Sequence, residues 1–498
     1  MRTLSLLLSA WWIAPAAFAS VDCQAGSSAP PSQSNTCYCA STACGGCPQT
    51  SNASLSGSAT DPHSVNVADF GARGDGAADD TAAIVRALAA GTVVVFPRLT
   101  YVVTGIWVPS NRTLLFDGTT IKLAAGSNAY AFTLTGATNV RFAGVLKIDG
   151  NKSAQTLPQG GGMILSAASS ANCFEYVEVV NPMEYGVAIS ASNENTFGSL
   201  KVTDPGGAGI ALNYQGAYLY LGGAADNKFY AIYGEGAAGN GVHLDSSTRN
   251  QFGLLELRSG GGKGLALGHN STYNSFTESF LESNGDNGAF LEAGSGHNRF
   301  RLIRAQSNTG NGLECNSDYN SFESVVATGS VDGGIGGVGV YLGGSCNALS
   351  SVVAAANERD GVRVASGEGN TLSLVTVNNS QREANVSDGL RFLEGATGNV
   401  VKSVVATDTQ AVKTQRYGVS NSAAATVNVV AMAYLEGNAT GPYISSGNDV
   451  VEQRSGSVEV TLPQLLILAG LPAPGDCAAG CDSFLPSRPC VPVPPPTQ

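Results

Sequence analysis

Short segments of alternating apolar and polar residues recur along most of this chain at a nearly constant spacing. Four copies of one phrase begin at Gly239, Gly262, Asp286 and Gly310, and each ends on an Asn-x-Phe tripeptide. The asparagines of these tripeptides stand at positions 250, 274, 298 and 320, so the steps are 24, 24 and 22 residues. A fixed period of about 20–50 residues predicts a solenoid or another repeat array.

The same ladder continues on both sides of these four copies. Further Asn-x-Phe or Asn-x-aliphatic tripeptides begin at Asn172, Asn195, Asn227, Asn347, Asn370 and Asn399. A second ladder, mostly Gly-aliphatic-x-aliphatic, runs in step with it at Gly186, Gly209, Gly241, Gly264, Gly288, Gly312, Gly339, Gly361 and Gly389. Alternation bounded by Gly, Asn and Ser predicts two short strands per repeat, with no crossover helix between them. The pattern therefore predicts an all-β fold, a single-stranded parallel β-helix of about ten coils, with equivalent strands stacked about 4.8 Å apart.

The alternation also predicts which side chains face the core. Phe252, Phe276, Phe300 and Phe322 should stack inward as a column, joined by aliphatic residues such as Val242. The repeated asparagines are expected at turns, where their amides bond backbone groups or the asparagine of the next coil. Both ladders are thus predicted to be structural and to carry no chemistry.

The two ends of the chain depart from the repeat. Residues 1–19 have a positive start, an apolar stretch and an Ala-Phe-Ala site, which is typical of a secretory signal peptide. Residues 20–61 read as a Cys-rich Ser/Pro linker, 62–460 as the β-helix, and 461–498 as a C-terminal cap and a Cys/Pro-rich tail. No other run reaches the roughly 18 apolar residues of a membrane span. We therefore expect a secreted, extracellular and monomeric protein.

Cysteine usage is consistent with export. Five of the eleven cysteines lie between positions 23 and 47, and three lie between 477 and 490. In an oxidising compartment these two groups are expected to form disulfides that staple segments too short to bury a core. The spacing of Cys37, Cys39, Cys44 and Cys47 leaves a zinc site as the alternative.

The charge balance restricts the partners. The formal net charge is −12, which argues against nucleic acid. A polyanionic ligand would require a local basic patch. Arg299, Arg301 and Arg304 stand together on one predicted strand and form the candidate patch.

The repeat region begins with a short strand, a Gly-rich turn and a helix. Residues 65–84 read VNVADFGARGDGAADDTAAI, and an Asp/Thr N-cap is expected to open a helix that runs to about Ala90 and closes the end of the solenoid. This segment, with the GTVVVFP and Tyr-Val-Val that follow, resembles the N-terminal signature of the pectate-lyase-like superfamily. That superfamily includes rhamnogalacturonase relatives, epimerase-like pectate lyase domains and mannuronan C5-epimerases. The resemblance implies a right-handed parallel β-helix that acts on, or binds, an acidic polysaccharide. Asp69, Asp75, Asp79 and Asp80 are an alternative metal site, and calcium is the candidate cofactor.

The catalytic motifs of that superfamily are incomplete in this chain. The three Asp residues, Gly-His-Gly and Arg-Ile-Lys of polygalacturonase-type hydrolases are absent from the repeats, as are the Trp-Ile-Asp-His and Arg-x-Pro-x-x-Arg motifs of calcium-dependent pectate lyases. Residues 146–152 are similar to a segment of the epimerases, and Glu184-Tyr185-Gly186 resembles the stretch that carries their catalytic Tyr. The epimerases continue with Asp-Pro-His, whereas this chain continues with Ala188, Ile189 and Ser190.

A candidate site is therefore read from the outward positions of the Gly-aliphatic-x-aliphatic strand. The x positions form a predicted column of Ala188, Ala211, His243, Ala266, Phe290, Glu314, Tyr341, Arg363 and Arg391. The next outward position contributes Ser190, Asn213, Asp245, Gly268, Glu292, Asn316, Gly343, Ala365 and Leu393. From Gly209 to Gly241 the spacing lengthens to 32 residues and includes five tyrosines, which predicts an extended loop beside His243.

These columns suggest specific roles. The predicted catalytic residues are His243, Asp245, Glu292, Glu314 and Tyr341, and the predicted substrate-binding residues are Arg363, Phe290, Arg391 and Tyr185. An arginine would neutralise a uronate carboxylate, and a Tyr, His or carboxylate would exchange the C5 proton. Glu292 and Glu314, on adjacent coils, are the alternative pair for glycosidic hydrolysis. The structural alternative is a solvated polar face.

Two functions follow from this reading. The first is a secreted enzyme that acts on a uronate-rich polysaccharide as a lyase, epimerase or hydrolase. The second is a non-catalytic β-helix that binds glycans or forms extracellular surface structure. The sequence leaves the polymer, the linkage and the reaction open.

Overall fold

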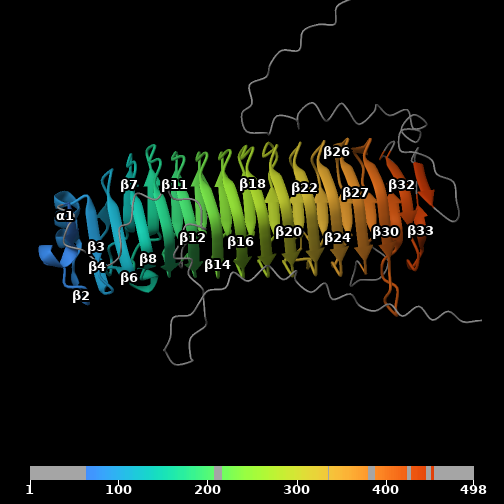
Figure 1. Ribbon diagram of the computed structural model, residues 1–498. Helices are drawn as coiled ribbons and strands as arrows, with labels where there is room; N and C mark the ends of the chain where they lie inside the picture. The colour runs from blue at the N-terminus through green and yellow to red at the C-terminus, as the bar shows by residue number, and fades with distance from the viewer. Residues whose placement is uncertain are drawn as a thin grey trace, which may run out of the picture. The chain divides into compact units, whose positions relative to one another are not determined.

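Alternating apolar residues direct the described part of the chain into two long parallel sheets. The computed structural model describes residues 63–206, 216–334, 336–379, 387–422, 425, 428–444 and 450–453, all within the unit formed by residues 45–498. Successive passes of the chain add strands alternately to the two sheets, and every strand pairing among these residues is parallel (Figure 1). The predicted parallel β-helix is confirmed.

The first sheet has 18 strands. Its strands are β1 (Ser64–Asn66), β2 (Asp75–Asp79), β3 (Val93–Phe96), β4 (Thr100–Val103), β6 (Thr113–Leu123), β8 (Arg141–Asp149), β10 (Cys173–Val180), β12 (Thr196–Thr203), β14 (Lys228–Glu235), β16 (Gln251–Arg258), β18 (Ser275–Glu282), β20 (Arg299–Gln306), β22 (Ser321–Thr328), β24 (Ala348–Ala355), β27 (Thr371–Asn378), β30 (Val400–Thr407), β32 (Val429–Tyr434) and β34 (Val450–Gln453).

The second sheet has 14 shorter strands. They are β5 (Ile106–Trp107), β7 (Tyr130–Thr135), β9 (Gly161–Ser166), β11 (Val187–Ser190), β13 (Leu219–Gly222), β15 (Val242–Asp245), β17 (Leu265–Gly268), β19 (Ala289–Leu291), β21 (Leu313–Cys315), β23 (Val340–Leu342), β25 (Val362–Val364), β28 (Leu390–Phe392), β31 (Tyr417–Asn421) and β33 (Gly441–Ile444). A third, two-stranded sheet pairs β26 (Gly367–Glu368) with β29 (Ala396–Thr397).

The solenoid is longer than the predicted ten coils, because the second sheet alone marks 14 of them among the described residues. The two sequence ladders run only from Asn172 to Asn399 and from Gly186 to Gly389. Coils such as those of β7 and β33 lie outside these limits and lack the repeated motifs. Counting motifs therefore gave too few coils. The predicted boundaries at residues 19, 61 and 460 lie outside the described residues and stay predictions.

One helix covers the N-terminal end of the stack. Helix α1 (Thr81–Ala90) buries Ile84 and Leu88 in the main core, and short 3-10 helices form at η1 (Val67–Phe70) and η2 (Lys152–Ala154) (Figure 1). The predicted end at Ala90 is confirmed. Covering the first coil removes its core and strand edges from water.

The aspartate side chains near helix α1 accept hydrogen bonds from backbone N–H groups of nearby turns. The Asp80 side chain is buried and accepts from the backbone N–H groups of Arg73 (2.6 Å) and Gly74 (3.1 Å), so it does not cap the helix as predicted. Asp79 accepts instead from the N–H of Thr81 at 2.9 Å. Asp75 accepts from two N–H groups within its own turn, and these bonds lower the pKa of its carboxyl group.

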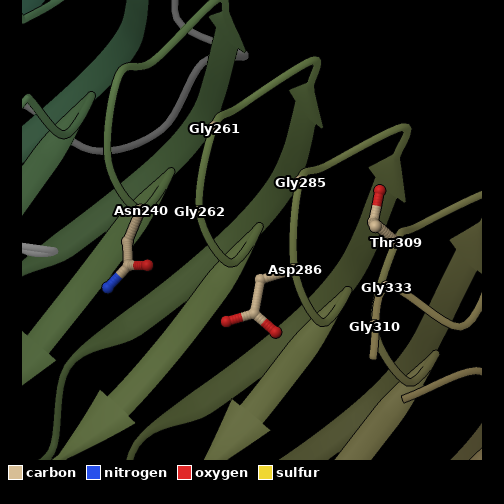
Figure 2. Close-up of a pocket in the computed structure, with 8 residues that line it drawn as sticks. All are labelled: Asn240, Gly261, Gly262, Gly285, Asp286, Thr309, Gly310 and Gly333. Atoms are coloured by element: carbon tan, nitrogen blue, oxygen red, sulfur yellow. The ribbon is translucent and has the colours of Figure 1, made fainter. Parts of the chain in front are cut away.

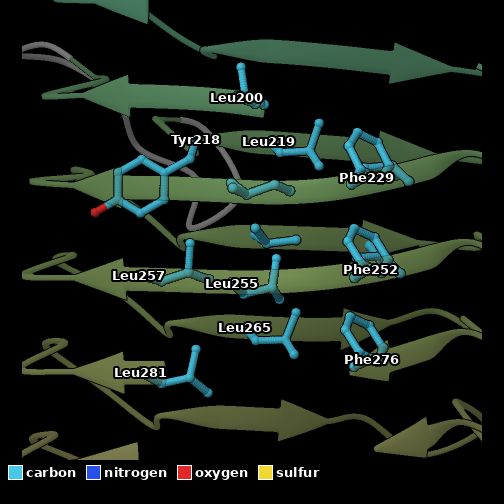
Figure 3. Close-up of a cluster of buried hydrophobic side chains, with 14 of the residues drawn as sticks. Leu200, Tyr218, Leu219, Phe229, Phe252, Leu255, Leu257, Leu265, Phe276 and Leu281 are labelled. Atoms are coloured by element: carbon cyan, nitrogen blue, oxygen red, sulfur yellow. The ribbon is translucent and has the colours of Figure 1, made fainter. Parts of the chain in front are cut away.

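The core contains the predicted column of phenylalanines. Seven rings stack from Phe174 to Phe322, with neighbouring centroids 4.4 to 5.1 Å apart. Figure 3 shows Phe229, Phe252 and Phe276 above one another, beside the leucines that complete each coil. Offset and parallel ring contacts add to the gain from burial. The prediction that these side chains point inward is confirmed.

The repeated asparagines form a continuous hydrogen-bonded ladder. In each step from Asn172 to Asn320 and beyond, the side-chain oxygen of one asparagine accepts from the backbone N–H of its predecessor, as between Asn274 and Asn298 at 2.8 Å. The side-chain nitrogens donate to backbone carbonyls or to the next asparagine. These side chains are fully buried but satisfied, so the predicted structural role is confirmed.

The described tyrosines of the stretch between Gly209 and Gly241 lie in or beside strands, whereas residues 207–215, where an extended loop is predicted, lie outside the described residues and that loop stays a prediction. Tyr218 and Tyr220 belong to the coil of β13, and Tyr218 is buried with its hydroxyl donating to the carbonyl of Arg258 at 2.7 Å. Gly234 makes room for that ring, because a Cβ there would lie 2.1 Å from it. Tyr230 lies on the outward face of β14. Tyr214 lies outside the described residues.

Candidate functional site

The predicted outward column of the second sheet exists with one correction. Strand register aligns Ala188, Tyr220, His243, Ala266, Phe290, Glu314, Tyr341, Arg363 and Arg391 in successive coils. Tyr220 occupies the place that was assigned to Ala211, and Gly222 the place assigned to Asn213. The sequence count began the strand at Gly209, whereas β13 begins ten residues later, at Leu219. Ala211 and Asn213 lie outside the described residues.

His243 is held as a neutral side chain. It is half-buried, and burial lowers its pKa to about 4, with His269 also lowering it and the Asp245 charge opposing the shift. The oxygen of the Asn240 amide accepts from the N–H of Lys263 at 2.9 Å, which orients its nitrogen toward Nδ1 of His243 at 3.0 Å. An amide nitrogen only donates, so Nδ1 accepts and the proton lies on Nε2. His243 therefore presents an N–H donor.

Two carboxylates lie on the coils around His243. Asp245 accepts from the hydroxyl of Ser246 at 3.1 Å and lies 3.2 Å from Nδ1 of His269, while Tyr220 donates to it at 3.4 Å. Glu292 accepts from the backbone N–H of His269 at 3.0 Å. His269 thus connects the two carboxylates across the intervening coil.

The coil between them carries the smallest side chains of the column. Ala266 and Gly268 on β17 are both buried, although they occupy outward positions. The position where a Cβ on Gly268 would stand lies 3.0 Å from Oε2 of Glu292 and 3.8 Å from Nε2 of His243. The side chains of Glu292 and His243, from the two neighbouring coils, therefore come together over the small residues of β17, and we call this place the Gly268 depression.

Aromatic rings flank this depression on both sides. Tyr220 stacks on Tyr185 at 5.2 Å and meets the edge of His243 at 5.8 Å. On the far side the ring of Phe290 faces the ammonium group of Lys263, 4.8 Å from the ring centre. Lys263 also pairs with Asp286 at 2.6 Å. Rings of this kind provide stacking surfaces for a sugar.

A shallow groove lies among the turns that precede the second sheet (Figure 2). It adjoins the depression through Asn240, which lines the groove and contacts His243. Asn240, Asp286 and Thr309 are the non-glycine side chains along it, and the other lining residues are Gly261, Gly262, Gly285, Gly310 and Gly333. A Cβ on Gly285 would lie 2.4 Å from the carbonyl oxygen of Gly261. The glycines are thus required where successive turns approach closely, and the groove follows from that approach.

Glu314 and Tyr341 lie further along the column, away from the depression. The carboxylate of Glu314 accepts from three side-chain amides: Asn287 and Asn311, each at 2.9 Å, and Asn316 at 2.7 Å. These bonds occupy the carboxylate, so the structure disfavours the predicted pairing of Glu292 with Glu314. Burial raises the pKa of Tyr341, with the Glu314 charge contributing.

Arg363 and Arg391 face buried carboxylates. Nε of Arg363 lies 2.6 Å from the Asp360 carboxylate, and Arg391 lies 3.9 to 4.0 Å from Asp388 and Asp360. Arg416 makes a bidentate pair with Asp388, at 2.9 and 2.7 Å. Both aspartates are fully buried, and burial raises the pKa of the Asp360 carboxyl group. The two arginines predicted to bind substrate therefore face buried aspartates, Arg363 within its own coil and Arg391 both within its coil and across to the neighbouring one.

Tyr185 is also enclosed. It is 6% exposed and lies in a small apolar cluster outside the main core, with Ala188, Ala217 and Tyr220. Its neighbour Glu184 accepts from the hydroxyl of Tyr130 at 3.0 Å. The ring of Tyr185 supports Tyr220 at the edge of the depression.

Sequence reasoning missed Asn240, Lys263 and His269 as parts of this site, and it assigned Tyr220 to a loop beside His243 and not to the outward column. One signal was available in the sequence. In five repeats an Asn or Asp stands directly before the repeated glycine, at Asn240, Asn287, Asn311, Asp360 and Asp388. Among the described ranges, no group of three or more His, Cys, Asp or Glu side chains is arranged to hold a metal ion. In the same ranges no helix is long and apolar enough to cross a membrane.

A family match covers the N-terminal part of the solenoid. Residues 64–220 match the family described as rhamnogalacturonase A/epimerase, pectate lyase-like, and this match confirms the resemblance to the pectate-lyase-like superfamily. No curated protein sequence matches the chain.

Several solved structures share low similarity with the chain. A mannuronan C-5 epimerase A-module of Azotobacter vinelandii is 15% identical with a TM-score of 0.39, over 78% of this chain and 99% of that one. The surface adhesin PfbA of Streptococcus pneumoniae is 14% identical with a TM-score of 0.35, over 76% and 91%. An exopolygalacturonase of Thermotoga maritima is 12% identical with a TM-score of 0.33, over 78% and 92%. These values are too low to transfer an activity.

Proposed function

We propose that this protein binds and acts on a uronate-rich polysaccharide at the Gly268 depression. The observation that carries the proposal is the convergence of Glu292 and neutral His243 over Gly268, with Asp245 beside them. The family match of residues 64–220 supports a carbohydrate ligand. Aromatic rings on both sides, Tyr220 and Phe290, support a sugar ring between them.

The two carboxylates lie on the coils that flank Gly268 and would supply the acid/base pair. Asp245 pairs with Gly268 in the register, and Glu292 follows one coil further, so their backbones are about 9.6 Å apart. In hydrolysis, one carboxylic acid gives a proton to the leaving oxygen. The other carboxylate takes a proton from a water molecule, and the oxygen of that water replaces the leaving oxygen at the anomeric carbon. His243 donates its Nε2 hydrogen to a sugar hydroxyl or carboxylate and keeps the ring in place.

The same pair serves chemistry at C5 of a uronate. One carboxylate removes the C5 proton. Returning a proton to the opposite face of C5 inverts that carbon, whereas breaking the C4–oxygen bond, with a proton given to the departing oxygen by the second carboxyl group, leaves a C4=C5 double bond in the sugar. The predicted export of the chain, with residues 1–19 as signal peptide, would bring the protein to extracellular polymers and belongs to this proposal.

The second candidate function is glycan binding without turnover. The bonds of Glu314, Arg363 and Arg391 favour it, because three of the predicted site residues are engaged in structural contacts. In this case the depression would bind the polymer and form part of an extracellular surface structure.

Turnover assays separate these functions. Purified protein is incubated with polygalacturonate, rhamnogalacturonan or alginate, with and without calcium. Absorbance of unsaturated uronate, reducing ends and NMR of the C5 configuration are followed together. We expect Asp245→Asn and Glu292→Gln each to lower the rate by at least about 100-fold, and Gly268→Val to block binding. Ala365→Val, at the equivalent outward position of the β25 coil, is the control.

Each result has a defined meaning. Unchanged rates in all three variants would overturn the placement of the site. Binding without any product, lost in Gly268→Val, would establish the glycan-binding alternative.

A further inference from the structure

Three exposed arginines lie on the solvent side of β20. Arg299, Arg301 and Arg304 are all solvent-exposed and lie within six residues, which is about 17 Å of strand. Among the described residues none of the three forms an ion pair, whereas Arg141, Arg249 and Arg258 each lie beside a carboxylate. Unneutralised cations gathered on one strand of a protein with a net charge of −12 indicate an external anion.

The neighbouring strands leave these arginines accessible. Arg299 pairs in register with Ser275 and Ser321, and Arg304 with Phe280 and Val326. Glu323 is the residue level with Arg301 on β22, and Glu278 of β18 pairs with Leu302 of β20. Phe280 is half-buried and gives Arg304 an aromatic neighbour on the surface. Arg299 and Arg304 thus have no carboxylate at the paired positions of the two neighbouring strands.

Three stacked rings lie at the turns that lead into this face. Tyr273, His297 and Tyr319 directly precede the ladder asparagines before β18, β20 and β22. Their centroids are 4.9 and 5.1 Å apart, and the rings are parallel to within 7°. All three have a left-handed backbone, with φ of 60°, 58° and 59°, a conformation in which bulky side chains are uncommon. The two tyrosines are more than one-third exposed.

The stacked rings connect the arginines with the Gly268 depression. The turn from β17 to β18 contains His269, beside the depression, and Tyr273, only four residues later. Four residues span at most about 14 Å. In the next coil, Glu292, His297 and Arg299 follow in the same order. One edge of the solenoid therefore presents, in sequence, carboxylates, planar rings and cations.

We propose that Tyr273, His297 and Tyr319, together with Phe280 and the three arginines of β20, form a second binding surface for an acidic polysaccharide chain. We call it the β20 face. This inference rests on the proposed function for the identity of the polymer. The guanidinium groups would bind its carboxylates in bidentate fashion, and the exposed ring edges would contact its apolar C–H surfaces. The 17 Å row fits several consecutive sugars, so the surface binds a polymer and not a single sugar.

The composition of the face favours a polysaccharide over a nucleic acid. Nucleic acid binding requires a broad basic surface, whereas the protein is acidic and the basic row is a single strand. Carboxylates spaced along a sugar chain need only a few matching cations. A charged sugar polymer is also the ligand proposed for the depression, so one chain would occupy both surfaces.

Calorimetric titration with polygalacturonate tests the proposal. The test variants are the triple change Arg299→Ala, Arg301→Ala, Arg304→Ala and the double change Tyr273→Asn, Tyr319→Asn. Asparagine tolerates the left-handed backbone, so the second variant preserves the turns. The control Arg249→Ala removes an exposed arginine whose charge Asp226 already neutralises. Circular dichroism confirms that each variant is folded.

We expect the triple variant to bind the polymer about 10- to 100-fold more weakly than the wild type, and the double variant to bind it more weakly as well. Turnover or binding of a short oligomer, which fills only the depression, should not change. Equal polymer affinity of the triple variant and the wild type would overturn the proposal. Equal binding of single-stranded DNA and polygalacturonate would overturn the assignment to polysaccharide. Asp245→Asn should retain polymer binding through the β20 face even when turnover is lost, which separates this proposal from the preceding one.

Discussion

Asn250 directs both its backbone N–H and its side-chain N–H to the same oxygen, Oδ1 of Asn274 in the next coil, at 2.9 and 3.1 Å. Asn274 repeats the arrangement with Asn298. Each side chain in this ladder therefore satisfies donors of the coil before it and depends on the coil after it. Such networks lose more than one bond when a single member is removed.

Replacing Asn274 by alanine should destabilise the solenoid strongly. The change leaves the buried backbone N–H of Asn250 without its acceptor and removes the side-chain donor to the Ser247 carbonyl, and each unsatisfied buried group costs about 1–3 kcal/mol. We expect the free energy of unfolding to fall by about 3–5 kcal/mol, measured by urea denaturation. Gln251 directly follows Asn250 and its side chain is exposed. Gln251→Ala should therefore change the free energy of unfolding by less than about 0.5 kcal/mol. Equal effects of the two changes would contradict the ladder's role.

The phenylalanine column allows a second stability test. Phe276 is 1% exposed and contacts Phe252 and Phe300 with ring centroids 4.7 and 4.6 Å away. Phe276→Ala should open a cavity between them and cost about 3–5 kcal/mol in thermal or urea unfolding. Phe280→Ala, four residues later on the outward face, should cost clearly less. A similar loss in both variants would argue against a packed ring column.

Arg363 should matter for stability more than for substrate. Removing it leaves the fully buried Asp360 without its nearest cation, 2.6 Å away, and uncompensated buried charges cost about 3–5 kcal/mol. Arg363→Ala should therefore lower the melting temperature, whereas Arg299→Ala, which removes an exposed arginine, should leave it unchanged. If Arg363→Ala weakened polymer binding at unchanged melting temperature, the original assignment of Arg363 to substrate binding would stand.

His243 makes stability depend on pH in a defined window. Its pKa is about 4 in the folded protein, against about 6.5 when unfolded. Between these values the unfolded chain binds a proton that the folded protein does not, so stability falls as pH is lowered from 6.5 to 4. The expected loss is on the order of 2 kcal/mol, seen by comparing urea midpoints at pH 7 and pH 4.5. His243→Gln should remove this part of the pH dependence, and Gln251→Ala should retain it.

The fold was predictable because its determinants repeat. Phe252, Phe276 and Asn274 recur at nearly fixed intervals, and one interpretation of their alternation satisfies every copy. The site was predictable only in part. Register brought His243, Asp245, Phe290 and Glu292 together as expected, since column positions follow from the same repeat.

The remaining site features depend on geometry that the repeat does not encode. Tyr220 was predicted in a loop beside His243 and not in the column, because the lengthened spacing precedes β13 and counting from Gly209 placed the strand too early. The engagement of Arg363 with Asp360 depends on how far each side chain reaches within a coil. The Asn240 amide that sets the tautomer of His243 belongs to a turn whose contacts run between coils, which alternation along one strand does not reveal.

Because the strands of each described coil pair with those of the adjacent coils, most contacts join residues about one repeat apart, as from Asn250 to Asn274. Relative contact order then falls as coils are added, so a longer chain does not require a slower search for its native pairing. Gene duplication could lengthen the molecule by whole coils without redesign of its interior. The length of the solenoid and of its outer surface would thereby become an evolvable quantity, adjustable one coil at a time.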